Sequence, residues 1–386
     1  MQMKPKTAAA IPVLLLFGAM SANAAQWRNE PFASASLRYD DNIRFVTGNA
    51  ESSVGTVFDV GVSMVNESEV TKTIFQPRAA FSGYASDGDL DSADQFLDFL
   101  TDFRGERTYL SFGINYVRDS SVTSELEDTG IVAAAVRRNY LNVSPRWEYR
   151  FSQKNALQFG YNYRSVDWDD SDNSGLEDNN TDEVWGAYKL NLSEHDDLSF
   201  KLSQTQFESP ESGFDSTTTG VDLSFVRRLS EVNRFELGLG GWNADLESPD
   251  GSSESESGGS LSGAVVHQDE TRTYRVSLSQ LVVPSSSGQV RQDRRLNGFY
   301  DYKFNPRLHW GVDGVFIQTE GIGSSVIEND RDYFTFRPFL AWEWKPKVTL
   351  SGSVRISTQE LVDTGAKSDR NELLFTVRYG TPQVAY

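Results

Sequence analysis

The chain has 386 residues, no cysteine, and a formal net charge of −19 at pH 7. The absence of cysteine excludes disulfide frameworks, Cys-ligated metal sites and lipid attachment through an N-terminal cysteine. A sequence pI near 4.6 argues against nucleic acid as a partner, because nucleic-acid-binding domains present a basic face.

The first 25 residues are predicted to be a cleaved signal peptide. Lys4 and Lys6 precede the apolar run 13–17, and Ala22-Asn23-Ala24 offers small residues at a cleavage site. The apolar run is too short for a membrane-spanning helix, and no later stretch approaches the ~20 apolar residues that such a helix needs. Residues 26–386 are therefore predicted to form one exported domain.

Alternation of apolar and polar residues recurs along almost all of 26–386. In 156–164 the residues Leu157, Phe159, Tyr161 and Tyr163 alternate with polar ones, and 334–344 repeats the pattern. Period two predicts β-strands. Segment 91–103 also has weak helical spacing, but alternation favours a strand there. About 18 strands are predicted, with 16 as the alternative, beginning near residues 32, 54, 71, 96, 107, 137, 156, 183, 197, 216, 233, 259, 271, 291, 307, 330, 347 and 370.

The predicted connections alternate in length. Tight turns are expected at 152–155, 194–197, 231–233, 305–307 and 345–347, and longer acidic, Ser/Gly-rich loops at 169–182, 208–216, 247–260, 320–332 and 361–371. This sorting is typical of a transmembrane antiparallel up-and-down β-barrel with short periplasmic turns and long acidic extracellular loops. A soluble exported sandwich or propeller also has alternating strands, but it has no reason to sort its connections. In lipid, closure into a barrel satisfies every strand.

Aromatic and proline residues on the apolar phase add detail to this barrel. Aromatic residues near predicted strand ends are typical of membrane interfaces; those predicted here are Trp147, Tyr149, Trp342 and Trp344 near short turns, and Tyr163 toward the opposite rim. Pro77, Pro145 and Pro338 each remove a ladder hydrogen bond, which predicts a bulge or local bend.

The opposite phase carries the candidate pore-lining cations. An Arg-rich lumen with low-dielectric walls attracts anions and can bind carboxylates through two hydrogen bonds. The alternative is that each cation is a wall residue paired with a nearby acid. The candidates are Arg38, Arg78, Arg104, Arg146, Arg150, Arg164, Lys189, Lys201, Arg228, Arg275, Arg337, Arg355 and Arg378.

No catalytic or metal site is predicted. The chain has three histidines, His195, His267 and His309, and none lies beside an extracellular Ser or Asp cluster, so we expect no enzyme activity. Asp169, Asp170, Asp172 and Asp178 offer hard oxygen ligands, but their spacing does not define a calcium site, and a solvated acidic loop is the favoured interpretation. No cofactor is expected.

The segment 39-YDDNI-43 carries a family resemblance. It resembles the opening of an outer-membrane β-barrel porin family associated with exopolysaccharide biosynthesis and export operons. The matching residues are Tyr39, Asp41 and Asn42. The resemblance implies a channel for a secreted polysaccharide that periplasmic export proteins deliver.

The favoured function is passive transport or export of a polysaccharide or another anionic solute across the outer membrane of a Gram-negative bacterium. The alternatives are a general diffusion porin for small solutes and a plugged structural or assembly barrel without flux. Loop 119–136 is a candidate for folding into the lumen. The expected partners are outer-membrane lipid, lipopolysaccharide and the barrel-assembly machinery, whose preferred last strand is typified by Leu373, Phe375, Val377 and Tyr379; exopolysaccharide and periplasmic export proteins are the partners that the resemblance implies, and nucleic acid is not expected.

Overall fold

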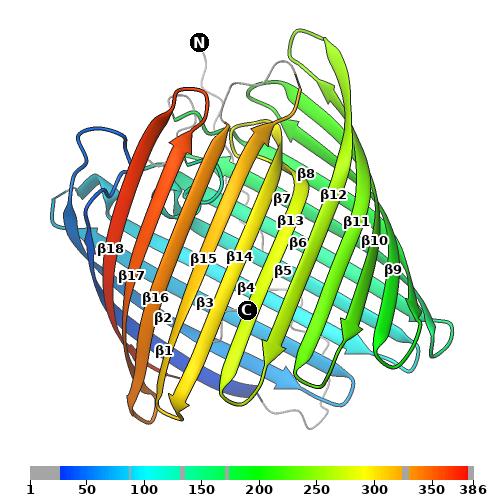
Figure 1. Cartoon of the computed structure of the whole chain (residues 1–386), viewed down its shortest axis with the longest axis horizontal. Coiled ribbons are helices and arrows are strands. Elements are labelled where there is room, and N and C mark those ends of the chain that lie inside the picture. The colour runs from blue at the N-terminus through cyan, green and yellow to red at the C-terminus, as the bar shows by residue number, and fades with distance from the viewer. Residues whose placement is uncertain (1–26, 87, 131–134, 170–173, 324–329, 381–386) are drawn as a thin grey trace.

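The chain forms a closed, 18-stranded antiparallel β-barrel in the computed structural model (Figure 1). The structure describes residues 27–86, 88–130, 135–169, 174–323 and 330–380. The predicted fold class is confirmed. The predicted signal peptide, 1–25, lies outside the described residues.

The strands are long, and two short helical segments lie in the connections. The 3-10 segment η3 is Gly88–Leu90 and the helix α1 is Ser121–Ser124. The strands are β1 (Trp27–Asp40), β2 (Ser53–Glu67), β3 (Thr71–Tyr84), β4 (Ser92–Arg104), β5 (Thr108–Ser120), β6 (Arg137–Arg150), β7 (Asn155–Trp168), β8 (Asn179–Asn191), β9 (Asp196–Ser209), β10 (Phe214–Arg228), β11 (Asn233–Glu247), β12 (Ser253–Gln268), β13 (Arg272–Pro284), β14 (Val290–Asn305), β15 (Leu308–Gly321), β16 (Arg331–Lys345), β17 (Val348–Leu361) and β18 (Ala366–Tyr379).

Each strand pairs with its neighbours in sequence, and β1 pairs with β18 to close the ring. The connections sort by end. Tight turns join β2 to β3, β4 to β5, and every second hairpin onward, at what we call the short-turn end; the other connections lie at the loop end, and the longest of these are 41–52 and 121–136. The alternation of connection lengths that the sequence predicts therefore describes the two rims of one barrel.

The two faces of the wall differ in chemistry. In β18, Leu373, Phe375, Val377 and Tyr379 are all exposed on the outside, whereas Glu372 is buried in contacts on the inside. Exposed large apolar residues occur on the outer face of all the strands from β14 to β18, for example Leu296, Phe316 and Leu340. An apolar exterior around a polar interior is the surface of a barrel in lipid rather than in water. No helix in the described ranges is both long and apolar enough to cross a membrane.

Several polar stretches expected as loops are in part extensions of strands. The loops expected at 208–216, 247–260 and 361–371 are shorter in the structure, where the connections are 210–213, 248–252 and 362–365. β12 already begins at Ser253, within the acidic run. Asn243 and Ser255 hydrogen bond across the β11–β12 ladder. When both faces of a strand meet water, apolar alternation disappears while backbone pairing continues, so the sequence pattern ended before the strands did.

The ladders show no bulge at the three prolines, and the alternative of a local bend stays a prediction. Beside Pro77 the β2–β3 ladder is interrupted between Gly61↔Arg78 and Met64↔Phe75, yet the register on both sides is the same. The β6–β7 ladder beside Pro145 and the β16–β17 ladder beside Pro338 show the same interruption and the same recovery. Each proline removes a donor locally, and the long strands on either side keep the alignment.

Candidate functional site

The predicted pore-lining cations lie on the side of the wall opposite to the exposed apolar residues. Arg38, for example, stands between the exposed Leu37 and Tyr39 and turns toward Glu372. Eight of the thirteen are held by carboxylates: Arg38–Glu372 (3.2 Å), Arg78–Asp59 (3.2 Å), Arg146–Glu148 (3.6 Å), Arg150–Glu148 (2.8 Å), Lys201–Glu183 (2.8 Å), Arg228–Asp197 (3.0 Å), Arg337–Asp313 (2.7 Å) and Arg355–Glu372 (3.7 Å).

The remaining five cations lack a carboxylate partner in the described part of the chain. Arg164 donates to the Thr181 hydroxyl (3.1 Å), and the Arg378 guanidinium lies 4.8 Å from the centre of the Phe32 ring. Arg104, Lys189 and Arg275 form no ion pair with any described residue. At these positions no carboxylate of the described residues lies within ion-pair distance of the cation.

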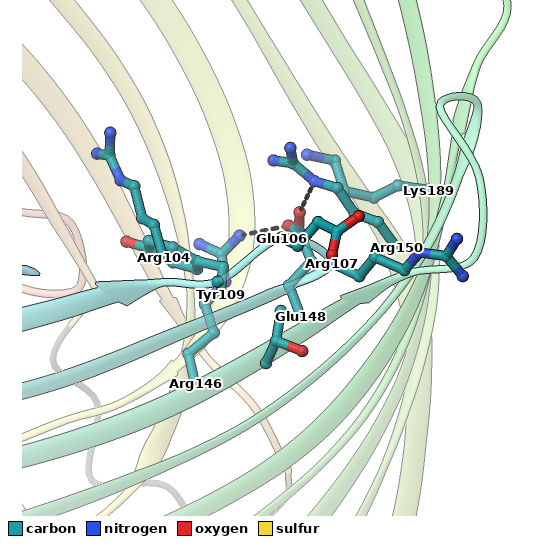
Figure 2. A pocket seen from close by; sticks show the side chains of 10 residues that line it. Arg104, Glu106, Arg107, Tyr109, Arg146, Glu148, Arg150 and Lys189 are labelled. Carbon is teal, nitrogen blue, oxygen red and sulfur yellow. Dashed lines mark hydrogen bonds and ion pairs between the residues drawn. The ribbon is translucent and has the colours of Figure 1, made fainter. Parts of the chain in front are cut away.

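Two of these unpaired cations belong to a basic cavity at the short-turn end (Figure 2). The cavity has a volume of about 420 Å³ and is lined by Arg104, Arg107, Arg146, Arg150, Lys189 and Tyr109, with Glu106 and Glu148 as its acids. Figure 2 shows Arg146 and Arg150 converging on the Glu148 carboxylate, while the Arg104 side chain extends away from it. The cavity therefore has more positive than negative charge.

The loop between β5 and β6 crosses the lumen. We call residues 121–130 the luminal arm: it begins with α1 above β5, and its tip contacts the wall at β14 and β16, half a turn around the ring. In Figure 1, β14–β16 lie in front of β5 and β6, on the opposite wall. The Asp128 carboxylate pairs with Arg291, and the Glu127 carboxylate lies 2.9 Å from Arg295.

Arg331 fixes the backbone of the luminal arm to the same wall. Its guanidinium donates to the Leu126 carbonyl (3.1 Å) and to the Asp128 carbonyl (2.9 Å), and it is almost fully buried. Since a charged donor forms stronger hydrogen bonds than a neutral one, these contacts hold the arm firmly across the bore.

The base of the luminal arm is buried against loop 41–52 and β6. Ile43 packs with Val122, and Phe45 packs edge-on against Tyr333 beside Leu126. Glu125 has no exposed surface, accepts a hydrogen bond from Thr129 (2.7 Å) and lies 3.8 Å from the Arg138 guanidinium. Burial and the nearby Asp128 charge raise the pKa of the Glu125 carboxyl to about 7.

The wall residues that hold the luminal arm were missed by the sequence reasoning. Arg291, Asp293 and Arg295 alternate at the start of a predicted strand, which is a visible signal of one charged face. Nothing local to that segment, however, indicates a partner at Asp128 or Glu127, because the contacts join distant parts of the chain.

The three resemblance residues lie at the rim of the β1–β18 seam. Tyr39 is exposed on the outer face. The Asp41 carboxylate accepts from the Asn371 backbone N–H (2.7 Å), and the Asn42 amide donates to the carbonyls of Val46 and Asp369 (both 2.9 Å). Neighbouring Asp40 pairs with Arg370 at 2.6 Å. The motif thus fastens loop 41–52 to the last strand.

The predicted interface aromatics lie on the outer face near the ends of their strands. Trp147 stacks on Phe159 at 5.8 Å, Tyr149 neighbours the last residue of β6, and Trp342 and Trp344 are exposed near the end of β16. Tyr163 lies in the loop-end half of β7, where its hydroxyl donates to Asn180 (3.2 Å).

The histidines and the acidic loop form no shared site among the described residues. His195 is in a turn, His267 stacks on Tyr274 at 4.8 Å, and His309 lies 2.7 Å from Asp301. The Asp178 carboxylate accepts from the Trp168 backbone N–H. Asp170 and Asp172 lie outside the described residues, and no metal-binding cluster occurs in the described ranges.

Comparisons with known proteins give structural matches alone. No protein-family profile and no curated protein matches the chain. Solved structures that match include OccK1 (OpdK) of Pseudomonas aeruginosa, with 12% identity, a TM-score of 0.49, and coverage of 92% of this chain and 98% of that one. OpdL of P. aeruginosa matches at 11%, 0.46, 93% and 99%, and OccAB1 of Acinetobacter baumannii at 10%, 0.48, 92% and 96%. At these values the matches do not indicate what this chain transports.

Proposed function

We propose that the chain is an outer-membrane channel for small solutes and that its lumen favours anions. The observation that carries the proposal is the luminal arm, which crosses the bore and is fixed to the opposite wall by Asp128–Arg291 and Glu127–Arg295. A lumen divided in this way admits small solutes beside the arm, whereas a polymer needs a continuous wide passage.

The outer face supports a location in the outer membrane of a Gram-negative bacterium. Its exposed apolar residues, such as Phe336, Leu340 and Phe375, meet hydrocarbon, and the closed ring leaves no strand edge unpaired in lipid. The short turns then face the periplasm, and the loop end meets lipopolysaccharide. Insertion requires the barrel-assembly machinery as a partner.

The preference for anions rests on the unpaired luminal cations. Arg104, Lys189 and Arg275 have no carboxylate partner in the described chain, and the basic cavity has five cations against two acids. Inside low-dielectric walls, uncompensated charge of one sign raises the local concentration of the opposite ion. The acidic residues that dominate the net charge lie largely toward the loop end, for example Asp250 and Glu254.

Polysaccharide export, which the Tyr39–Ile43 resemblance implies, is the weaker proposal. Tyr39 points outward, and Asp41 and Asn42 are engaged in rim contacts, so none of the three is available to guide a polymer. A plugged barrel without flux is the second alternative, and the conductance measurement below separates it from a channel.

The test is the reversal potential of the refolded chain in a planar bilayer under a KCl gradient. We expect an anion-selective current that an added acidic polysaccharide does not block. Arg104→Gln and Lys189→Gln are expected to weaken the selectivity, because each removes an unpaired luminal charge. Lys367→Gln is the matched control: it removes the same charge from an exposed position paired with Glu360 (2.8 Å).

Cation selectivity, or an equal effect of all three variants, would refute the anion preference. Block by the polysaccharide would support export instead. No conductance from a chain shown to be folded would leave the plugged barrel as the correct description.

A further inference from the structure

The Asp128 carboxylate sits in a receptor made by the opposite wall. It pairs with the Arg291 guanidinium and accepts a hydrogen bond from the Ser286 hydroxyl at 3.1 Å. Arg291 is itself held in place, since it donates to Asp293 at 2.8 Å and to the Ser285 hydroxyl at 3.1 Å. A guanidinium and a hydroxyl directed at one carboxylate form the donor set that proteins use to bind carboxylate ligands.

Arg331 adds a second buried cation beside the first. It is 1% exposed, and within the described chain it forms no ion pair; its hydrogen bonds go to the carbonyls of Leu126 and Asp128 and to the Gln359 amide oxygen (3.3 Å). A buried cation requires compensation by a negative charge or by oriented dipoles. The only dipoles that the luminal arm supplies here are two carbonyls, and these leave whenever the arm leaves.

The receptor is accessible from the lumen but is filled. The Asp128 side chain is 31% exposed, so solvent reaches it. The space left beside it, between Asp128, Arg291 and Arg331, has a volume of about 20 Å³, which accommodates roughly one water molecule. A solute carboxylate therefore binds there only if Asp128 moves out.

We propose that Arg291, Arg331 and Ser286 form a binding site for carboxylate solutes, and that Asp128 occupies this site as a tethered competitor. A solute that binds displaces the tip of the luminal arm and widens the bore for its own passage. This inference rests on the proposed function, because it names the solute class and the gate of the same channel. Asp128 is thus a gating residue, and Arg291 and Arg331 are the ligand-binding residues.

With a tethered competitor, the apparent affinity for the free ligand equals the intrinsic affinity multiplied by the fraction of the time that the site is empty. Removing its charge while keeping its shape should raise that affinity. Asp128→Asn does so, because the carboxamide oxygen still accepts from Ser286 while the ion pair with Arg291 is lost. Glu127→Gln is the matched control: it removes an ion pair of the same arm, with Arg295, but leaves Asp128 in the site.

The experiment is calorimetric titration of the full refolded chain in detergent micelles with sodium propionate, and with propionamide as the uncharged analogue. We expect Asp128→Asn to bind propionate at least about tenfold more tightly than the unmodified chain does. The gain in propionate affinity in Glu127→Gln should be less than half of the gain in Asp128→Asn. Propionamide should bind equally weakly to all three. Arg291→Gln should abolish propionate binding in the Asp128→Asn background.

Equal propionate affinities for the unmodified chain and Asp128→Asn would overturn the inference, and so would an equal gain in Glu127→Gln, which would mean that loosening the arm is sufficient. Planar-bilayer conductance of the same samples separates this failure from failure of the proposed function. If the channel proposal is wrong, no variant conducts. If the channel proposal is right and the competitor is not, all variants conduct while their propionate affinities agree.

Discussion

Opening of the luminal arm should depend on pH through Glu125. This residue has no exposed surface at the base of the arm. Burial and the Asp128 charge raise the pKa of its carboxyl from 4.5 to about 7, against the opposing effects of Thr129, Arg138 and Arg291. In an open arm the same carboxyl is hydrated and its pKa returns to the ordinary value. Protonation therefore favours the closed arm, and ionisation opposes it.

The sign and the size follow from linkage. For an acid whose pKa is raised in the closed state, the stabilisation is fully present below the ordinary pKa and is lost as the pH rises through the raised one. A rise from 4.5 to about 7 corresponds to about 3 kcal/mol when the group is fully ionised. Between about pH 5 and pH 8 the closed arm loses roughly 2–3 kcal/mol, which is a 30- to 150-fold change in the ratio of open to closed arm.

The assay is single-channel recording of the refolded chain across that pH range. We expect the open probability to rise with pH in the unmodified chain, and to stay low and independent of pH in Glu125→Gln, which keeps the shape of the protonated form. The Asp128 carboxyl does not share in this titration: burial raises its pKa, but Arg291 and the hydrogen bond from Ser286 outweigh burial and leave the pKa below its ordinary value. An open probability that falls with pH, or the same pH dependence in Glu125→Gln, would refute the reasoning.

Two further predictions concern stability, measured as the urea dependence of the folded fraction in lipid vesicles. Leu340→Arg, on the outer face, should destabilise the barrel by about 2–4 kcal/mol, whereas Leu100→Arg, on the luminal face of β4, should change stability little; equal costs would contradict the assignment of the two faces. Arg370→Gln should cost about 3 kcal/mol, because it leaves the buried Asp40 without its partner, and the double change with Asp40→Asn should cost less. A double variant that is less stable than Arg370→Gln alone would show that Asp40 is stabilised by other contacts.

Most of the wall is readable from the sequence, and the reason is physical. A strand between hydrocarbon and water must alternate, so Leu373, Phe375 and Val377 identify their strand without knowledge of its neighbours. The same reasoning fails where water lies on both sides. Ser253 to Gly258 belong to β12, but their side chains carry no apolar phase, and the pairing with β11 that makes them a strand is not a local property.

The site is readable only in part. Parity along each strand selects the face that carries Arg38, Arg146 and Arg337, but the acid that pairs with each depends on the register between strands. The position of the luminal arm is harder still to predict from the sequence, because its contact between Asp128 and Arg291 joins residues separated by more than a hundred positions in the chain. Loop 119–136 is the segment that the sequence suggests as a candidate for folding into the lumen, and no local pattern indicates which wall it meets.

The rim contacts of the β1–β18 seam have a consequence for the width of the channel. The shear of a closed barrel is the stagger between neighbouring strands summed around the ring. Together with the number of strands, the shear determines the tilt of every strand and the circumference of the ring. A slip of one residue at the seam is forbidden by the exchange of faces. A slip of two residues preserves both faces, so apolar burial does not oppose it. The ion pair of Asp40 with Arg370 and the double contact of Asp41 with Asn371 exist in one alignment alone. These few polar residues therefore favour one register at the seam, and with it one circumference among those that the apolar pattern permits.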